Sequence, residues 1–296
     1  MTNRRYTDLK VTPGTYVPPV TVAYPEDNPY EKMHKPVYDR DFPDIDASYP
    51  YVDDSLRNKM CLRLSAFFVL PLLGLILRIK YGLRWRIEGE QQWHRCTWSV
   101  RRWLRQFDLT NGAITIANHC YRHDCASVLT ALGTEWRTDM RIPMFAPNFK
   151  TKDQAYLLMV GGIPIPAQEA GLSAMKAFNA AFDEFNRRGY WFHIFPEAKR
   201  WDWYKPIRPF QKGAFTMSYK YNKPLIPCAV TYRPRTGLWR FWGPKDEPLT
   251  QVVIGAPIYP NTTAPRAAET ERLLNETHQT ICRLAGIEHN TWPSAL

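Results

Sequence analysis

A histidine and an aspartate five residues apart, His119 and Asp124, form the pair in this sequence best suited to acid–base chemistry. The apolar run 113–117 comes directly before them and predicts a buried strand. An imidazole can take up a proton near pH 7, and a nearby carboxylate can fix its tautomer and stabilise the imidazolium. Positions five apart on one helix face different ways, so the pair needs a turn and a new helix that begins near Asp124. The sequence therefore predicts a general base at the end of a strand.

The same short segment offers two competing chemistries. His119, Cys120, His123 and Cys125 lie within seven residues, and such side chains can bind zinc. Their spacings fit no usual structural zinc pattern, and adjacent ligands suit one tetrahedral ion poorly, so we expect no metal site. Cys120 could act as a nucleophile, but only the neighbouring histidine would activate it. General base chemistry at His119 is the preferred interpretation.

Three downstream segments give the histidine–aspartate pair a context. The first ends a strand and combines an acid with two cations, and the other two are rich in proline and apolar residues. The segments are Phe-Pro-Glu-Ala-Lys-Arg at 195–200, Pro-Phe-Gln-Lys-Gly-Ala-Phe at 209–215 and Lys-Pro-Leu-Ile-Pro-Cys-Ala-Val at 223–230. Together with Asn-His-x-x-x-x-Asp at 118–124, their order resembles that of the glycerolipid acyltransferases, the family of the lysophosphatidic acid acyltransferases. The resemblance covers roughly residues 85–260.

The resemblance implies transfer of an acyl group from acyl-CoA or acyl carrier protein to a lipid hydroxyl. The donor would be a substrate, and no cofactor is expected. His119 would be the base that activates the acceptor hydroxyl, and Asp124 would orient it. Arg200 would contact the acceptor phosphate, and Glu197, the motif glutamate, and Lys199, a second cation, would also bind substrate. Lys212 is expected to bind substrate too, and Lys205 and Arg208 to extend a basic rim. The expected acceptor is 1-acyl-sn-glycerol-3-phosphate, which would give phosphatidic acid.

Two departures from the family pattern bear on the acceptor. Ala198-Lys199 stands where the family has Gly-Thr, so the backbone freedom of a glycine is lost. Residues 161–168 occupy the place where the family's second motif often ends in an arginine, and no arginine is present there. Another lysolipid or amphiphilic alcohol is therefore an alternative acceptor. A non-catalytic lipid-binding homologue is a further alternative.

Composition limits the partners that the chain can have. The net charge of +11 and the pI of about 9.4 favour anionic partners. No Lys/Arg block of the nucleic-acid-binding type stands out, so an anionic membrane surface and a phosphorylated lipid are preferred over nucleic acid. Six irregularly spaced cysteines do not make a disulfide scaffold. The N-terminus lacks the apolar run of a signal peptide, so we expect a protein at the cytoplasmic face of the cell membrane.

The chain divides into three regions. Residues 1–54 are rich in proline and tyrosine and should be extended. Residues 55–83 contain the most apolar stretch, 64–77, with basic residues on both sides. Fourteen helical residues span about 21 Å, short of a ~30 Å bilayer core, so this region should lie at the membrane interface; a buried core helix and a true span are the alternatives. Residues 84–296 form the predicted catalytic domain.

Strands and helices alternate along the catalytic domain. This order predicts an α/β fold in which helices flank a parallel or mixed sheet, like that of the glycerolipid acyltransferases. The expected strands are 84–88, 113–117, 142–146, 190–195, 225–231 and 251–254, and the expected helices are 91–107, 124–132, 151–159, 172–188, 212–221 and 265–285.

Overall fold

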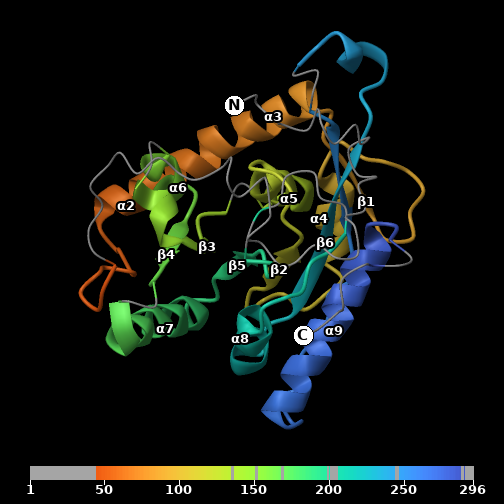
Figure 1. Ribbon diagram of the computed structural model, residues 1–296. Helices are drawn as coiled ribbons and strands as arrows, with labels where there is room; N and C mark the ends of the chain where they lie inside the picture. The colour runs from red at the N-terminus through yellow and green to blue at the C-terminus, as the bar shows by residue number, and fades with distance from the viewer. Residues whose placement is uncertain are drawn as a thin grey trace, which may run out of the picture.

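The computed structural model describes residues 45–134, 137–150, 153–167, 170–198, 200, 206–243, 247–287 and 290. Within these residues, seven strands form one sheet in the order β1-β7-β6-β2-β5-β3-β4, and only the β6–β7 pair is antiparallel. The predicted mixed sheet with flanking helices is therefore confirmed (Figure 1). The strands are β1 (Arg84–Ile87), β2 (Ile114–Ala117), β3 (Met140–Phe145), β4 (Gly162–Ile165), β5 (Trp191–Ile194), β6 (Leu225–Arg233) and β7 (Leu249–Ile254).

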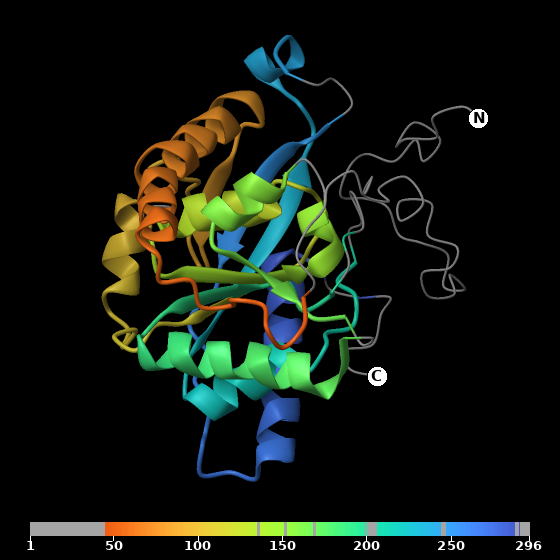
Figure 2. The ribbon, with the colours of Figure 1, turned by 90° about the vertical axis from the view of Figure 1, so that its left-hand side faces the viewer.

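Helices cover both faces of the sheet (Figures 1 and 2). The apolar residues of the central strands alternate between two cores, because successive side chains of a strand point to opposite faces. Ala117 of β2 faces the core under α3 and α5, whereas Ile114 and Ile116 face the core under α7, α8 and α9. The helices are α2 (Leu56–Leu64), α3 (Leu70–Lys80), α4 (Trp98–Leu104), α5 (Asp124–Leu132), α6 (Gln154–Met159), α7 (Gly171–Arg187), α8 (Gly213–Tyr221) and α9 (Arg266–Leu284), with short helical turns η1 (Ser65–Val69), η2 (Ala146–Lys150) and η4 (Gly237–Arg240).

Most expected elements are present, and one helix is much shorter than expected. A helix was expected over 91–107, but α4 begins only at Trp98. The backbone of His94 instead pairs with that of Trp85 in an antiparallel bridge, with N···O distances of 2.7 and 2.9 Å. Residues before α4 therefore serve as an extra edge for β1, a tertiary contact that local periodicity does not show.

The apolar N-terminal helix is longer than expected. Leu56–Lys80 is one helical run of 25 residues, in which the π-helical turn η1 precedes Pro71. At ~1.5 Å per residue it measures about 37 Å, so the expectation of a helix shorter than a bilayer core is corrected. One face packs on the domain from Leu62 onward: Leu62, Ala66, Leu70 and Leu77 are buried, and Gly74 lies against Thr130 of α5.

The described end of the N-terminal segment packs on the domain through a tyrosine. Tyr51 is 7% exposed, and its ring meets that of Phe178 on α7 edge to face at 5.7 Å. Asp54 forms an ion pair with Arg188 just after the same helix. The expectation of an extended segment over 1–44 lies outside the described residues.

Candidate active site

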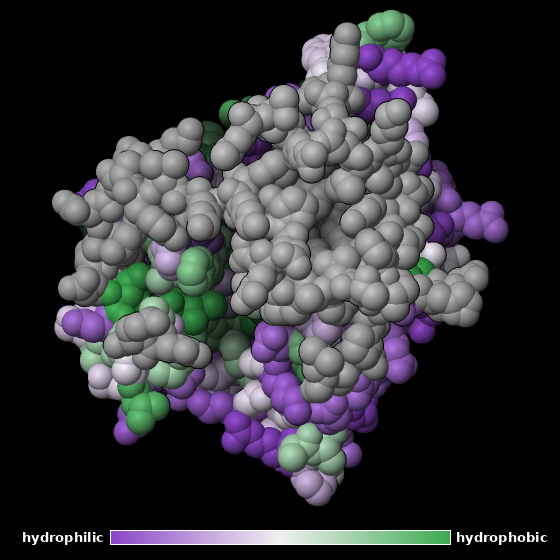
Figure 3. All heavy atoms as spheres, viewed as in Figure 1, coloured by the Kyte–Doolittle hydropathy of each residue, from purple (hydrophilic) through white to green (hydrophobic). Residues whose placement is uncertain are grey.

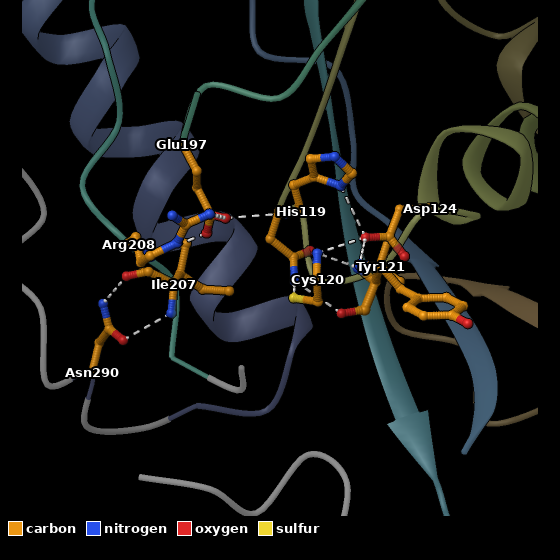
Figure 4. Close-up of polar contacts among 10 residues, drawn as sticks. His119, Cys120, Tyr121, Asp124, Glu197, Ile207, Arg208 and Asn290 are labelled. Carbon is orange, nitrogen blue, oxygen red and sulfur yellow. Dashed lines mark hydrogen bonds and ion pairs between the residues drawn. The ribbon is translucent and has the colours of Figure 1, made fainter. Parts of the chain in front are cut away.

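The turn between β2 and α5 brings His119 and Asp124 together. The strand ends at Ala117, and the helix begins at Asp124, as the sequence predicted. His119 Nδ1 lies 3.2 Å from Asp124 Oδ2 (Figure 4). The Asp124 side chain is 2% exposed, whereas that of His119 is 21% exposed. The pair therefore combines a buried carboxylate with an imidazole that solvent and a substrate can reach.

The Asp124 carboxylate organises the whole turn as a hydrogen-bond acceptor. The backbone N–H groups of Cys120 and Tyr121 both donate to Oδ2 at 2.6 Å. The hydroxyl of Tyr232, on β6, donates to Oδ1 at 2.9 Å. An ionised carboxylate only accepts hydrogen bonds, so the Nδ1 atom of His119 that faces it is the donor. Nε2 is then the nitrogen that can accept a proton.

The imidazole of His119 is fixed by stacking as well as by Asp124. Its ring lies on that of Phe195, with centroids 4.0 Å apart and planes 13° from parallel. Nε2 points away from Asp124 in Figure 4. In the part of the chain that the structure describes, no hydrogen-bond partner occupies Nε2. This nitrogen is thus available to take a proton from a bound molecule.

Asn118 ties the turn to the neighbouring strand. Its side chain accepts a hydrogen bond from the backbone N–H of Val230 at 2.7 Å and donates to the carbonyl of the same residue at 3.0 Å. Asn118 is buried, and this paired contact continues the β2–β6 ladder past the end of β2. The position of the His119 backbone therefore depends on β6.

Glu197 faces the protein interior. Its side chain is 2% exposed and forms an ion pair with Arg208, whose Nη2 lies 2.8 Å from Oε2. The backbone N–H of Arg208 donates to Oε1, and that of His119 donates to Oε2, both at 3.1 Å. These contacts favour a role in positioning the His119 turn over the predicted direct contact with substrate. Arg208 is buried in this ion pair and so does not extend an exposed basic rim, and Lys205 lies outside the described residues.

The remaining predicted cations are divided between two places. Arg200 is half-buried, and its charge acts on His123, so it lies on the side of the turn where α5 begins. Lys212 is 63% exposed and pairs with Glu271 of α9 at 3.0 Å, so its amino group sits at the α8–α9 contact. Lys199 lies outside the described residues. Arg200 is therefore the predicted cation that the structure places near the turn.

A positive field surrounds His123. Burial and, to a smaller extent, the nearby charges of Arg122, Lys80 and Arg200 together lower the pKa of His123 to about 4. Its ring sits between those of Tyr81 and Tyr121, at centroid distances of 5.0 and 5.3 Å. Three cations act on this uncharged imidazole, and the carboxylate of Glu247, which acts on Arg122 and accepts a hydrogen bond from Tyr121, offsets part of their charge.

The competing chemistries receive no support from the geometry. Among the described residues, no group of three or more His, Cys, Asp or Glu side chains is placed to hold a metal ion. Burial raises the pKa of the Cys120 thiol well above its ordinary value, and Asp124 and Glu197 raise it further. A thiol held in its neutral form is a poor nucleophile.

Sequence reasoning missed the residues that hold the pair in place. Tyr232 and Val230 lie more than a hundred residues away from the turn. Val230 ends the recognised segment 223–230, but no local signal assigns either residue to the turn. Phe195 is part of the recognised segment, but its stacking on His119 follows only from the parallel pairing of β2 with β5. Only a prediction that β2 and β5 are neighbouring strands could have suggested that Phe195 stacks on His119.

Comparison with known proteins gives a family match over the part of the chain that contains this turn. The family model described as "Acyltransferase" matches residues 86–231, a range that contains His119, Asp124, Glu197 and Arg200. Among solved structures, the 1-acyl-sn-glycerophosphate (LPA) acyltransferase PlsC from Thermotoga maritima is similar, with 16% sequence identity and a TM-score of 0.45. That match covers 74% of this chain and 80% of the other. No curated protein matches the chain.

Proposed function

Since this chain belongs to the acyltransferase family, we propose that it is an O-acyltransferase that moves an acyl group from a thioester to the hydroxyl of a lipid. The observation that carries this proposal is the His119–Asp124 pair, with Nδ1 held by the buried carboxylate and Nε2 directed outward. An alcohol is a weak nucleophile until its proton is removed, and the pair supplies the base for that step.

The proposed reaction needs no acyl-enzyme. The acceptor hydroxyl oxygen attacks the thioester carbonyl carbon while its proton passes to Nε2 of His119. A carbon–oxygen bond forms, the carbon–sulfur bond breaks, and the proton on Nε2 passes to the departing thiolate. Asp124 stabilises the imidazolium that exists between these transfers. Glu197 holds the backbone of His119 at its N–H, so the base keeps its position while its side chain changes charge.

An anionic acceptor and donor fit the charge of the site. Arg122, Lys80 and Arg200 lie around His123, next to the pair. Phosphate groups bind such clusters through charge-assisted hydrogen bonds. We propose 1-acyl-sn-glycerol-3-phosphate as the acceptor, giving phosphatidic acid, and acyl-CoA or acyl carrier protein as the donor. Lys199 and Lys212 are further candidates for contact with these anions.

The helix Leu56–Lys80 supports membrane association as an interfacial segment. Its outer face is apolar and exposed, and its inner face is buried on the domain from Leu62 onward. A helix that crosses the bilayer would need lipid or other membrane segments around it, and here the catalytic domain occupies one side. We therefore propose that it lies in the plane of the membrane surface, at the cytoplasmic face, where both types of thioester donor are available.

The proposal is tested by offering acyl-CoA or acyl carrier protein together with mixed lysolipids and other alcohols, and identifying products by mass spectrometry. The expected product is phosphatidic acid, formed by the unaltered protein and not by the His119→Ala variant. A matched control is His94→Ala, because His94 also pairs with a carboxylate, at 3.0 Å from Glu90, and is 22% exposed. Intact thioester in every mixture would favour a non-catalytic lipid-binding protein.

A different lysolipid or amphiphilic alcohol is the second candidate acceptor. Residues 161–165, on and before β4, carry no arginine where the family's second motif often has one. Acylation of an uncharged alcohol at a higher rate than 1-acyl-sn-glycerol-3-phosphate would support this alternative and would leave the acyl-transfer proposal intact.

A further inference from the structure

The connection between β6 and β7 ends in an exposed apolar tip, defined here as residues 237–243. Leu238 is 81% exposed, Phe241 89% and Trp242 64%. Single exposed apolar residues are common on protein surfaces, but three at one turn form a patch that marks an interaction site. We infer that this tip is a second membrane anchor that inserts into the anionic lipid surface together with the helix Leu56–Lys80. The inference extends the membrane association proposed above and rests on it.

The tip is attached firmly to the end of that helix. Trp239 turns inward, and its indole Nε1 donates to the carbonyl of Ile79 at 2.8 Å. The Nη1 group of Arg235 donates to the carbonyls of Lys80 and Trp242, at 3.3 and 2.9 Å. The exposed side chains are therefore presented by a braced turn, and little conformational freedom is lost when they insert.

The tip lies in line with the helix, and the exposed apolar residues of the two are called the strip here. In both ribbon views the tip lies on the extension of the helix axis beyond Lys80 (Figures 1 and 2). The space-filling view shows hydrophobic beside hydrophilic residues where the tip projects (Figure 3). The exposed residues of the helix recur every three or four positions and so share one face. They are Leu56, Met60, Leu64, Phe67, Phe68, Leu72, Leu75, Ile76 and Ile79.

The charges around the strip select an anionic lipid surface. The helix Leu56–Lys80 and residues 234–243 contain several cations and no aspartate or glutamate. Apolar side chains between basic residues suit the boundary between acyl chains and anionic head groups, where tryptophan is also favoured. The cations are Arg57, Lys59, Arg63, Arg78 and Lys80 in the helix and Arg235 and Arg240 at the tip.

Two anchors at different points have a consequence that one helix lacks. A single interfacial helix can tilt so that one end leaves the surface, whereas an additional anchor beyond its end resists that tilt. The turn that carries His119 then keeps a fixed orientation to the lipid surface. The tip should therefore affect acyl transfer to vesicle-borne acceptor more than transfer to a dispersed, short-chain acceptor.

The test is sedimentation of the full chain with vesicles of phosphatidylcholine that contain phosphatidylglycerol. The variant is the double change Leu238→Glu and Phe241→Glu, and the matched control is Leu172→Glu, because Leu172 is also 81% exposed but begins α7, at the opposite end of the molecule. We expect the tip variant to need at least about tenfold more lipid for half-binding, since burial of one such side chain is worth that ratio. The control variant should bind like the unaltered protein.

Two results would overturn the inference. One is unchanged vesicle binding by the tip variant while Leu72→Glu with Ile76→Glu, on the helix, abolishes it. The other is a change in self-association by sedimentation velocity, with vesicle binding unaltered, which would assign the tip to contact with a second copy. Transfer to the dispersed acceptor separates this test from the proposed function: the tip variant should keep it, and its absence in the unaltered protein would refute the acyltransferase proposal alone.

Discussion

Two turns at the carboxyl ends of neighbouring parallel strands, β2 and β5, use similar groups in opposite ways. After β2, the carboxylate of Asp124 holds one nitrogen of His119 and leaves the other open. After β5, the carboxylate of Glu197 uses both oxygens on Arg208 and on the His119 backbone, and no part of that ion pair reaches solvent. The comparison teaches that a group can act on a substrate only if one of its polar atoms has no partner in the protein. A side chain whose polar atoms all bind the protein serves instead to position that group.

The largest expected effect is a loss of activity when His119, in the turn after β2, is replaced. His119→Ala should lower kcat by about 10²–10⁴-fold, the usual contribution of a general base. The free energy of unfolding should change by no more than about 1 kcal/mol, since a partly exposed side chain is removed. Product formation and denaturant unfolding measure the two quantities, with His94→Ala as control. A folded His119→Ala variant that retains most of its activity would remove the catalytic role.

The second prediction concerns the contribution of Glu197, in the turn after β5, to the free energy of unfolding. Glu197→Gln keeps the shape of the side chain but removes the negative charge that Arg208 faces in the buried ion pair, which should cost about 3–5 kcal/mol of the free energy of unfolding. The control is Glu184→Gln, whose more exposed ion pairs with Arg187 and Arg188 should contribute little to the free energy of unfolding. If Glu197→Gln instead lost activity with unchanged stability, Glu197 would belong with the substrate-binding residues after all.

A third prediction concerns a buried side-chain contact between β2 and β5. His193 of β5 is fully buried beside Thr115 of β2, with Nδ1 2.7 Å from Oγ1, and burial lowers its pKa to about 3. Between the ordinary pKa near 6.5 and this value, the unfolded chain binds a proton that the folded chain does not. The free energy of unfolding should therefore fall as pH falls, by about 1.4 kcal/mol per pH unit from this residue at most.

Denaturant unfolding between pH 6.5 and 5 checks that slope. His193→Leu should make it shallower, while the contributions of His123 and His278, whose pKa values are also lowered by burial, remain. An identical slope in the variant would show that His193 binds its proton equally in the folded and unfolded chains.

The smallest expected effect lies directly after Glu197. Ala198 has a φ of 60°, a left-handed conformation that costs an alanine about 1–2 kcal/mol and a glycine little. Ala198→Gly should raise the free energy of unfolding by up to about 1 kcal/mol, after the greater freedom of glycine in the unfolded chain is counted. Ala285→Gly is the control and should be destabilising, because Ala285 has a φ of −75°. Destabilisation by both changes would contradict the assigned strain.

The sequence alone predicted most of the elements and the turn that brings His119 to Asp124. The apolar run before His119 and the new helix at Asp124 are local features, so periodicity and turn geometry were sufficient to predict them. The same applies to α7, which was expected over 172–188 and is found at Gly171–Arg187. The helix expected over 91–107 was wrong in its first part, because pairing with a distant strand decided that segment.

Only the tertiary structure decided which charged residues remain available for a substrate. Arg208 and Lys212 look alike in sequence, as cations near the same recognised segments. The fold buries the first against Glu197 and leaves the second exposed at the α8–α9 contact. It also brings Tyr232 to Asp124 and the tip 237–243 to the end of the N-terminal helix. The physical reason is that helix and turn signals act over a few residues, whereas burial and pairing depend on strands brought together from distant parts of the chain.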